Sequence, residues 1–170
     1  MSQGTPPDSS PPAPDHQALR QKYRLERDKR LRPDGNDQYL EPRGKFAHLL
    51  DDPYTPRVDR APCREDVTFA FIGGGFAGLV TGARLKQAGV SDFRILEGGG
   101  DVGGTWYWNR YPGAMCDTAA MVYLPLLEET GHRPSMKYTF APEIFAHAQR
   151  IAKTFGLYEN ALFSTAVKSL

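Results

Sequence analysis

The feature that most constrains the fold is an apolar run that ends in glycines, VTFAFIGGGFAG at residues 67–78. Its first half, 67–72, is almost continuously apolar, as in a parallel strand that is covered on both faces. Residues 76–88 have a helical composition, and Gly89 stands where a left-handed helix end is favoured. A second apolar segment, 93–96, predicts another strand. Strand, helix and strand in this order indicate a βαβ unit, and therefore an α/β fold.

The glycines of this run fit the pattern G-x-G-x-x-G, which is typical of dinucleotide-binding turns. Gly73 permits a tight turn, Gly75 lets a pyrophosphate approach the backbone, and Gly78 lets the helix pack closely. The helix then begins with Phe76 and Ala77. Free backbone N–H groups at this positive helix end would bind the pyrophosphate.

An acidic residue, Glu97, stands at the end of the second predicted strand, about 20 residues beyond the glycines. Its carboxylate can accept hydrogen bonds from both ribose hydroxyls and would repel a 2′-phosphate. We therefore expect FAD or NAD rather than NADP at this site. The alternative is an ordinary glycine-rich turn beside a surface charge. The strand, the helix and the acid together favour a Rossmann-like dinucleotide site.

A second glycine-rich loop, GGTWYWNRYPG, covers residues 103–113. A double glycine followed by several aromatic residues predicts a backbone that approaches a cofactor closely, with aromatic walls that exclude water. By itself, the loop is equally compatible with a hydrophobic patch that caps the sheet.

Composition argues against several other classes of function. Lys and Arg total 21 against 20 Asp and Glu, for a net charge of +1, so we expect no nucleic-acid partner. Because there is no membrane-length apolar stretch and no signal-peptide pattern, we expect a cytoplasmic protein without a membrane partner. The two cysteines, Cys63 and Cys116, favour reduced thiols over a disulfide or a metal site.

By composition the chain divides into three segments. Residues 1–15 are rich in proline and predict a disordered leader. Residues 16–66 predict a helix that ends near Arg32, followed by a proline-rich extension that wraps a surface. Residues 67–170 predict a globular domain. Beyond the βαβ unit, this domain is expected to contain a helix at 142–155 and a strand at 162–167.

The segment 67–117 resembles the start of the Baeyer–Villiger monooxygenases, which are class B flavoprotein monooxygenases. The resemblance rests on IGGGFAG at 72–78, on Glu97 and on GGTWYWNRYPG at 103–113, and it continues more weakly to Phe163. It implies the FAD-binding domain of the flavoproteins that have two dinucleotide-binding domains. This chain would hold part of that domain, with a helical and disordered N-terminal extension.

The resemblance also implies cofactors, substrates and site residues. Members reduce FAD with NADPH and use O₂ to insert an oxygen atom beside a ketone or to oxidise a heteroatom. The glycine turn and Glu97 would hold FAD. The other implied positions are Gly104, Thr105, Trp106 and Tyr123 near the flavin, Asp117 as an acid of the active site, and Met115 and Cys116 where their loop approaches the nicotinamide cofactor.

Two departures from the family pattern leave two hypotheses open. Members commonly read Arg-Cys-Asp and then Glu-Ser where this chain reads MCDTAA at 115–120. A second glycine fingerprint for NADPH and a histidine-containing motif between the domains do not occur in these residues. The chain would then be an N-terminal fragment or truncated product of a monooxygenase. Alternatively, it is a non-catalytic dinucleotide-binding or interaction module that keeps the first half-site. The pattern predicts no oligomeric state.

Overall fold

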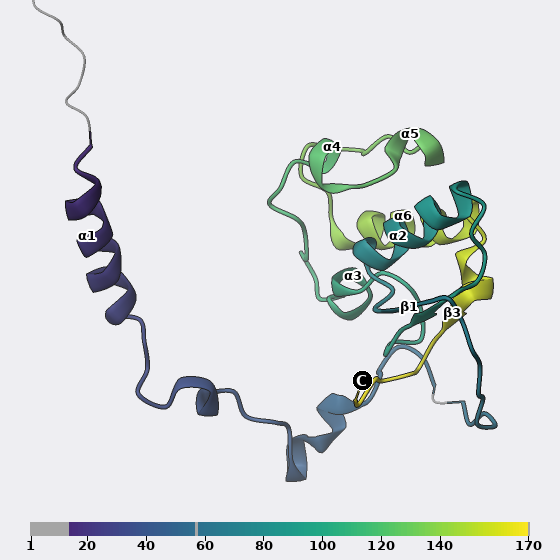
Figure 1. Ribbon diagram of the computed structural model, residues 1–170, viewed down its shortest axis with the longest axis horizontal. Coiled ribbons are helices and arrows are strands. Elements are labelled where there is room, and N and C mark those ends of the chain that lie inside the picture. The colour runs from purple at the N-terminus through teal and green to yellow at the C-terminus, as the bar shows by residue number, and fades with distance from the viewer. Residues whose placement is uncertain (1–13, 57, 170) are drawn as a thin grey trace, which may run out of the picture. The chain divides into compact units, whose positions relative to one another are not determined.

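A computed structural model describes residues 14–56 and 58–169 (Figure 1). The chain falls into two compact units, Met1–His48 and Leu49–Leu170. The leader expected at 1–15 lies almost wholly outside the described residues.

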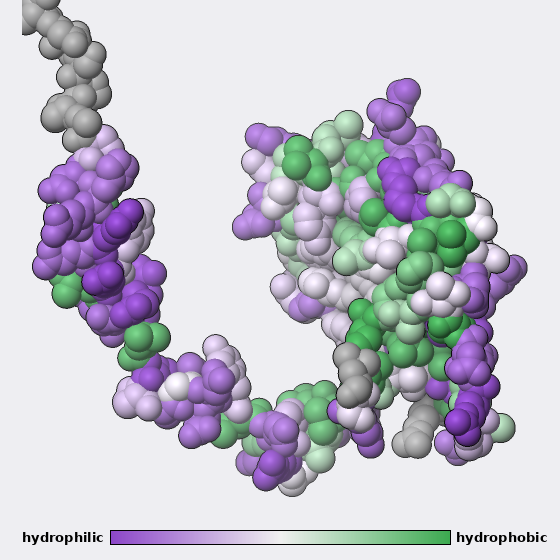
Figure 2. Space-filling view, in the orientation of Figure 1, coloured by the Kyte–Doolittle hydropathy of each residue, from purple (hydrophilic) through white to green (hydrophobic). Residues whose placement is uncertain are grey.

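The first unit is built around one helix, α1 (His16–Asp28). The side chain of Asp15 accepts hydrogen bonds from two backbone N–H groups of the first turn, at 2.9 and 3.1 Å, and so caps the helix. No residue of α1 is buried, and Figure 2 shows that its surface is mostly hydrophilic. Two 3₁₀ helices follow, η1 (Gly35–Gln38) and η2 (Gly44–Leu50). The helix expected from the sequence is present, although it ends before Arg32.

The second unit contains a parallel sheet of three strands in the order β1 (Phe69–Ile72), β2 (Phe93–Leu96) and β3 (Ala161–Leu162). In the register of β1 and β2, Ile72 lies opposite Leu96. Helix α2 connects these two strands, so the βαβ unit and the Rossmann-like α/β fold expected from the sequence are confirmed.

Two long helices, α2 (Phe76–Gln87) and α6 (Ala141–Thr154), pack on one face of the sheet (Figure 1). Phe93 and Ile95 point to the same side of β2 and are buried in one apolar cluster with residues from both helices. Helix α2 can lie close to the sheet because its buried side is made largely of small residues. Its buried residues are Gly78, Leu79, Gly82 and Ala83.

Short elements complete the second unit. These elements are α3 (Thr105–Trp108), α4 (Ala120–Tyr123), α5 (Leu127–Thr130) and η3 (Leu157–Asn160). Three of them, α3, α4 and α5, contribute to a second apolar cluster, whereas η3 packs in the first. Trp106, Ala114 and Ile144 belong to this second cluster, which brings α3 against α6. Among the described residues, no helix is both long and apolar enough to cross a bilayer.

Two details of the expected sheet were wrong. Strand β1 is not covered on both faces, because Ile72 is 59 % exposed, whereas Phe71, which points to the opposite side, packs against the buried cluster. Helices α2 and α6 cover one face only, and β1 lies at an edge of the described sheet. The last strand is β3, at 161–162, rather than a strand at 162–167. The backbone of Ser164 has a φ of +51°, which breaks the extended conformation soon after β3.

Candidate dinucleotide site

The first glycine loop lies between the carboxyl end of β1 and the start of α2. Gly73 has a φ of +103°, and its N–H group donates to the carbonyl oxygen of Leu96 at 2.7 Å. A Cβ atom added at Gly78 would lie 2.1 Å from the carbonyl oxygen of Gly73. Helix α2 begins at Phe76 after Gly75, which offers no side-chain cap. The loop therefore leaves the first N–H groups of α2 available to an anion.

Glu97 follows β2 directly and is buried, with 6 % of its surface exposed. Its Oε2 atom accepts a hydrogen bond from the N–H of Gly74 at 2.5 Å, and its Oε1 atom accepts one from the N–H of Gly99 at 2.7 Å. The carboxylate is therefore turned into the first glycine loop. Each carboxylate oxygen retains capacity for another donor, so two ribose hydroxyls can still be bound.

The second glycine loop touches the first. The N–H of Gly103 donates to the carbonyl oxygen of Gly74 at 2.9 Å. A Cβ atom added at Gly104 would lie 2.9 Å from the Cα atom of Gly75. Gly103 and Gly104 have φ values of +123° and +53°, which favour glycine. The double glycine of the sequence thus serves both a turn and a close contact between two loops.

A cluster of three aromatic side chains lies beside the two loops. The indole Nε1 of Trp106 donates to the hydroxyl of Tyr123 at 2.7 Å, and the two rings meet edge to face. Phe76, at the start of α2, also meets the Tyr123 ring edge to face. Thr105 is exposed at the start of α3, whereas Trp106 is buried. The structure thus brings together three residues that the sequence singled out separately.

The loop at 115–117 alternates between the surface and the core. Met115 is 45 % exposed and forms an antiparallel bridge with Phe140, and Asp117 is exposed. Cys116 is buried in the apolar cluster that contains Trp106. Its backbone N–H donates to the backbone carbonyl oxygen of Thr139 at 3.1 Å. Met115 and Asp117 are therefore accessible to a ligand, whereas the thiol of Cys116 is directed into the core.

One residue near the site, Asp52, was not found from the sequence. Its carboxylate accepts hydrogen bonds from the hydroxyl of Tyr107 at 2.5 Å and from the N–H of Gly100 at 2.9 Å. Burial raises the pKa of Asp52, but these bonds and two more from its own turn outweigh it, so the pKa lies below the ordinary value. Burial and then Asp52 raise the pKa of Tyr107. The only sequence signal was an Asp-Pro turn, which is common in loops.

A groove of about 590 Å³ lies beside the loop that follows Glu97. Gly98, Thr55, Arg60 and Ser164 are among the residues that line it. The guanidinium of Arg60 donates to the carbonyl oxygen of Phe163 at 3.0 Å, which fixes one wall. Gly98, which lines the groove, follows Glu97 directly in the sequence.

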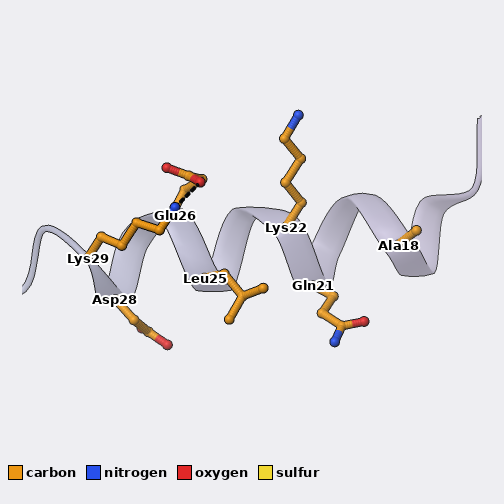
Figure 3. Close-up of a pocket in the computed structure, with 7 residues that line it drawn as sticks. All are labelled: Ala18, Gln21, Lys22, Leu25, Glu26, Asp28 and Lys29. Atoms are coloured by element: carbon orange, nitrogen blue, oxygen red, sulfur yellow. Dashed lines mark hydrogen bonds and ion pairs between the residues drawn. The ribbon is translucent and has the colours of Figure 1, made fainter.

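A hollow of about 620 Å³ on α1 has a different character (Figure 3). All its lining residues belong to α1 or to Lys29, which caps its C-terminus, and Figure 3 shows their side chains projecting in different directions. Lys29 and Glu26 form the ion pair drawn there, at 2.7 Å. Because no second element closes it, this hollow is no candidate site.

Comparison with known proteins identifies the relatives of this chain. Residues 72–151 match the family described as an NAD(P)-binding Rossmann-like domain. A Baeyer–Villiger monooxygenase of Streptomyces coelicolor is 55 % identical over 153 residues, which cover 89 % of this chain and 25 % of that protein. The chain thus spans about a quarter of the length of the curated relatives it matches.

Solved structures give the same result. The polycyclic ketone monooxygenase of the fungus Thermothelomyces thermophila superposes with a TM-score of 0.74 at 38 % identity, over 90 % of this chain and 26 % of that one. The structure titled OTEMO complex with FAD and NADP superposes with a TM-score of 0.54 at 33 % identity, over 61 % and 20 %. In sequence and in fold, the chain therefore belongs to the Baeyer–Villiger monooxygenase family and corresponds to the N-terminal part of its members.

Proposed function

We propose that this chain forms the FAD-binding part of an NADPH- and O₂-dependent Baeyer–Villiger monooxygenase that acts on ketones or heteroatom compounds. One observation carries the proposal: two glycine loops meet beyond the carboxyl ends of β1 and β2, and the buried carboxylate of Glu97 is hydrogen-bonded to the first of them. Ligands of open α/β sheets bind at such an edge. A solved relative whose title names FAD and NADP supports the choice of cofactors.

The residues present fit the ADP half of FAD. Gly73 and Gly75 leave the backbone bare beside the first turn of α2, where the N–H groups of Phe76 and Ala77 have no side-chain cap. Glu97 retains lone pairs for the ribose hydroxyls. The groove beside Gly98 would hold the adenine.

The second glycine loop would face the flavin half. Gly104 and Thr105 present backbone and a small exposed side chain there, while Trp106 and Tyr123 form an apolar wall that excludes water. FAD, when bound, supplies the redox chemistry that transfers electrons from NADPH to O₂. Met115 and Asp117 are exposed on the loop where a nicotinamide would approach. Asp117 is our candidate for the acid of the active site, and Cys116 would support this loop from behind.

A titration of the full chain with FAD, followed by flavin fluorescence, tests the cofactor assignment. We expect weak but saturable binding, because later contacts to the cofactor come from parts of the relatives that this chain does not span. Glu97→Gln should weaken that binding about tenfold, since a charged hydrogen-bond acceptor to the ribose is lost. Glu41→Gln, at an exposed position of the first unit, is the matched control. Equal affinity in all three proteins would remove Glu97 from the ribose role.

Binding without turnover is the second candidate function. The exposed side chains of β1 favour it, because the sheet formed by the described residues is covered on one face only. Oxidation of NADPH, measured with FAD and a cyclic ketone present, separates the two functions. We expect the rate for this chain to stay at background, because hydride transfer needs a second dinucleotide site. Ketone-dependent turnover would show that the chain is catalytic by itself.

We also propose a cytoplasmic location. Both cysteines are free thiols in the structure, Cys63 exposed and Cys116 buried, which suits a reducing compartment.

A further inference from the structure

Asp52 lies at the centre of a hydrogen-bond network that joins the proline-rich segment to the loop after β2. Its Oδ1 atom accepts bonds from the N–H groups of Tyr54 and Thr55, at 2.9 and 3.2 Å, and so shapes its own turn. Its Oδ2 atom accepts bonds from the N–H of Gly100 and the hydroxyl of Tyr107, at 2.9 and 2.5 Å. One carboxylate thus holds two segments that are far apart in the sequence.

The same two segments also fit each other in shape. A Cβ atom added at Gly100 would lie 2.2 Å from the Cβ atom of Thr55, and one added at Gly99 would lie 2.8 Å from the ring of Tyr107. The hydroxyl groups of Thr55 and Tyr107 are 2.8 Å apart. The glycines at 99 and 100 therefore allow the turn and the tyrosine ring to lie directly against the loop.

A third contact holds the turn at its other end. The Tyr54 hydroxyl donates to the carbonyl oxygen of Trp108 at 3.1 Å. The guanidinium carbon of Arg110 lies 4.0 Å from the centre of the Tyr54 ring and 4.6 Å from that of Tyr107. Such cation–π contacts stabilise partly buried aromatic pairs. The turn is thus fixed to the second glycine loop as well as to the loop after β2.

The network ends on the carboxylate of the candidate site. The N–H of Gly99, next to the amide that Asp52 binds, is one of two backbone donors that orient the carboxylate of Glu97. Tyr107, the other partner of Asp52, is held by the N–H···O bond to Gly104 at 3.0 Å. The Asp52 carboxylate is therefore connected to Glu97 through the Gly99–Gly100 peptide, and it binds the second glycine loop directly at Tyr107.

We propose that Asp52 is a positioning residue of the dinucleotide site: by holding Gly100 and Tyr107 together, it fixes the loop whose Gly99 amide orients Glu97 toward the ribose. The proposal rests on the proposed function, since it needs an adenosine ribose at Glu97. The segment before the sheet is then part of the cofactor site, although it contributes no atom to the glycine fingerprint.

Asp52→Asn is the sharpest substitution, because it keeps the shape of the side chain. An amide has one acceptor oxygen and an NH₂ group that cannot accept, so it cannot bind both pairs of donors at once. Tyr107→Phe removes one donor and keeps the ring against Gly99. Asp37→Asn, at an exposed position of the first unit, removes the same charge elsewhere and is the matched control.

Amide hydrogen exchange on the full chain, read by NMR, tests whether Asp52 holds the loop. In Asp52→Asn we expect the amides of Gly99 and Gly100 to exchange about tenfold faster, while amides in the middle of α6 keep their rates. Asp37→Asn should change none of these rates. Unchanged exchange at Gly99 and Gly100 in Asp52→Asn would overturn the proposal. Equal acceleration throughout the second unit would also overturn it, because that result reports general destabilisation.

FAD affinity then tests the connection to Glu97 through a double-mutant cycle. We expect Asp52→Asn to weaken FAD binding about tenfold in the unsubstituted background and less than about twofold beside Glu97→Gln. If Asp52→Asn weakened FAD binding equally with and without Glu97→Gln, Asp52 would not act through Glu97. FAD binding by the chain would still be established. If the unsubstituted chain bound no FAD, the proposed function would fail, and Asp52 would be reduced to a structural residue even if its loss accelerated exchange.

Discussion

At Gly78 the position of a side chain is already occupied by backbone. The hypothetical Cβ atom lies 2.1 Å from the carbonyl oxygen of Gly73, which is itself held in a turn with positive φ. Gly78→Ala must therefore push α2 away from β1. We expect it to lower the free energy of unfolding by about 3 kcal/mol, as overpacking against backbone does. Urea unfolding followed by circular dichroism measures the change.

Gly98→Ala is the control for that experiment. Gly98 has ordinary negative-φ backbone and nothing within 4 Å of its hypothetical Cβ atom. We expect its free energy of unfolding to stay within about 0.5 kcal/mol of the unsubstituted chain. Equal destabilisation by the two substitutions would show that close contact is not what requires glycine at position 78.

Single residues were predictable from the sequence where the backbone alone dictates them. The glycine pattern identified Gly73 and Gly78, because a turn and a helix contact exclude larger residues whatever lies around them. Asp52 could not be found this way, since its partners Gly100 and Tyr107 are distant in the sequence. A motif also does not indicate which way a side chain points. It placed Cys116 on a cofactor loop, but it could not show that the thiol is directed into the core.

At the scale of elements, α6 carries a buried titratable group, His147. Its side chain is fully buried, and Nε2 donates to the carbonyl oxygen of Pro125 at 2.7 Å. Burial lowers the pKa of His147 below its ordinary 6.5. Nearby His132 and Arg150 lower it further, while the Pro125 bond and Glu143 oppose the change. The ring therefore stays neutral in the folded protein at pH values where the unfolded chain is protonated.

The sign of the pH effect follows from that pKa. Below about pH 6.5 the unfolded chain binds more protons than the folded one, so the free energy of unfolding falls with acidification. Between pH 7.5 and 5.5 we expect a loss of about 1 kcal/mol from this residue. His147→Gln retains a donor for Pro125 and should flatten the dependence, whereas His48→Gln, at an exposed position, should not. Parallel pH curves for all three proteins would contradict this assignment.

The elements themselves were largely readable from the sequence. Helices α2 and α6 begin and end close to the expected residues, because Gly89 and Gly156 terminate them with positive φ. The extent of the last strand could not be predicted. Ser164 has a left-handed backbone conformation, and serine is not a residue type that indicates one. Local composition therefore predicts the end of a helix more reliably than the length of a paired strand.

For the whole molecule, the important feature is the exposed apolar side of β1. Ile72 is 59 % exposed, whereas Ile95 in the neighbouring strand β2 is fully buried. We expect Ile72→Thr to raise the protein concentration at which aggregation begins and to change the free energy of unfolding by less than about 0.5 kcal/mol. Ile95→Thr should destabilise the chain by about 2–3 kcal/mol. Light scattering and urea unfolding measure the two effects.

If Ile72→Thr aggregated as readily as the unsubstituted chain, association would not depend on this surface. The sequence could not predict the exposure of β1. A continuous apolar run indicates that a strand can be buried, but it does not indicate which neighbouring elements bury it. The relatives are about four times as long as this chain, and the residues that the structure describes cover one face of the sheet only.

The contact between Gly75 and Gly104 has a consequence for how such sequences can diverge. The two loops come from separate stretches of chain, yet the missing side chain of one is the space that the other occupies. The conflict is one-sided: a Cβ atom at Gly104 would lie 2.9 Å from the Cα atom of Gly75, whereas one at Gly75 would lie 3.6 Å from the Cα atom of Gly104, which is ordinary contact. During evolution position 104 is therefore held to glycine by the backbone of a distant loop, while this contact places no such restriction on position 75. A mutational scan read out by folding should find alanine excluded at position 104 and tolerated at position 75.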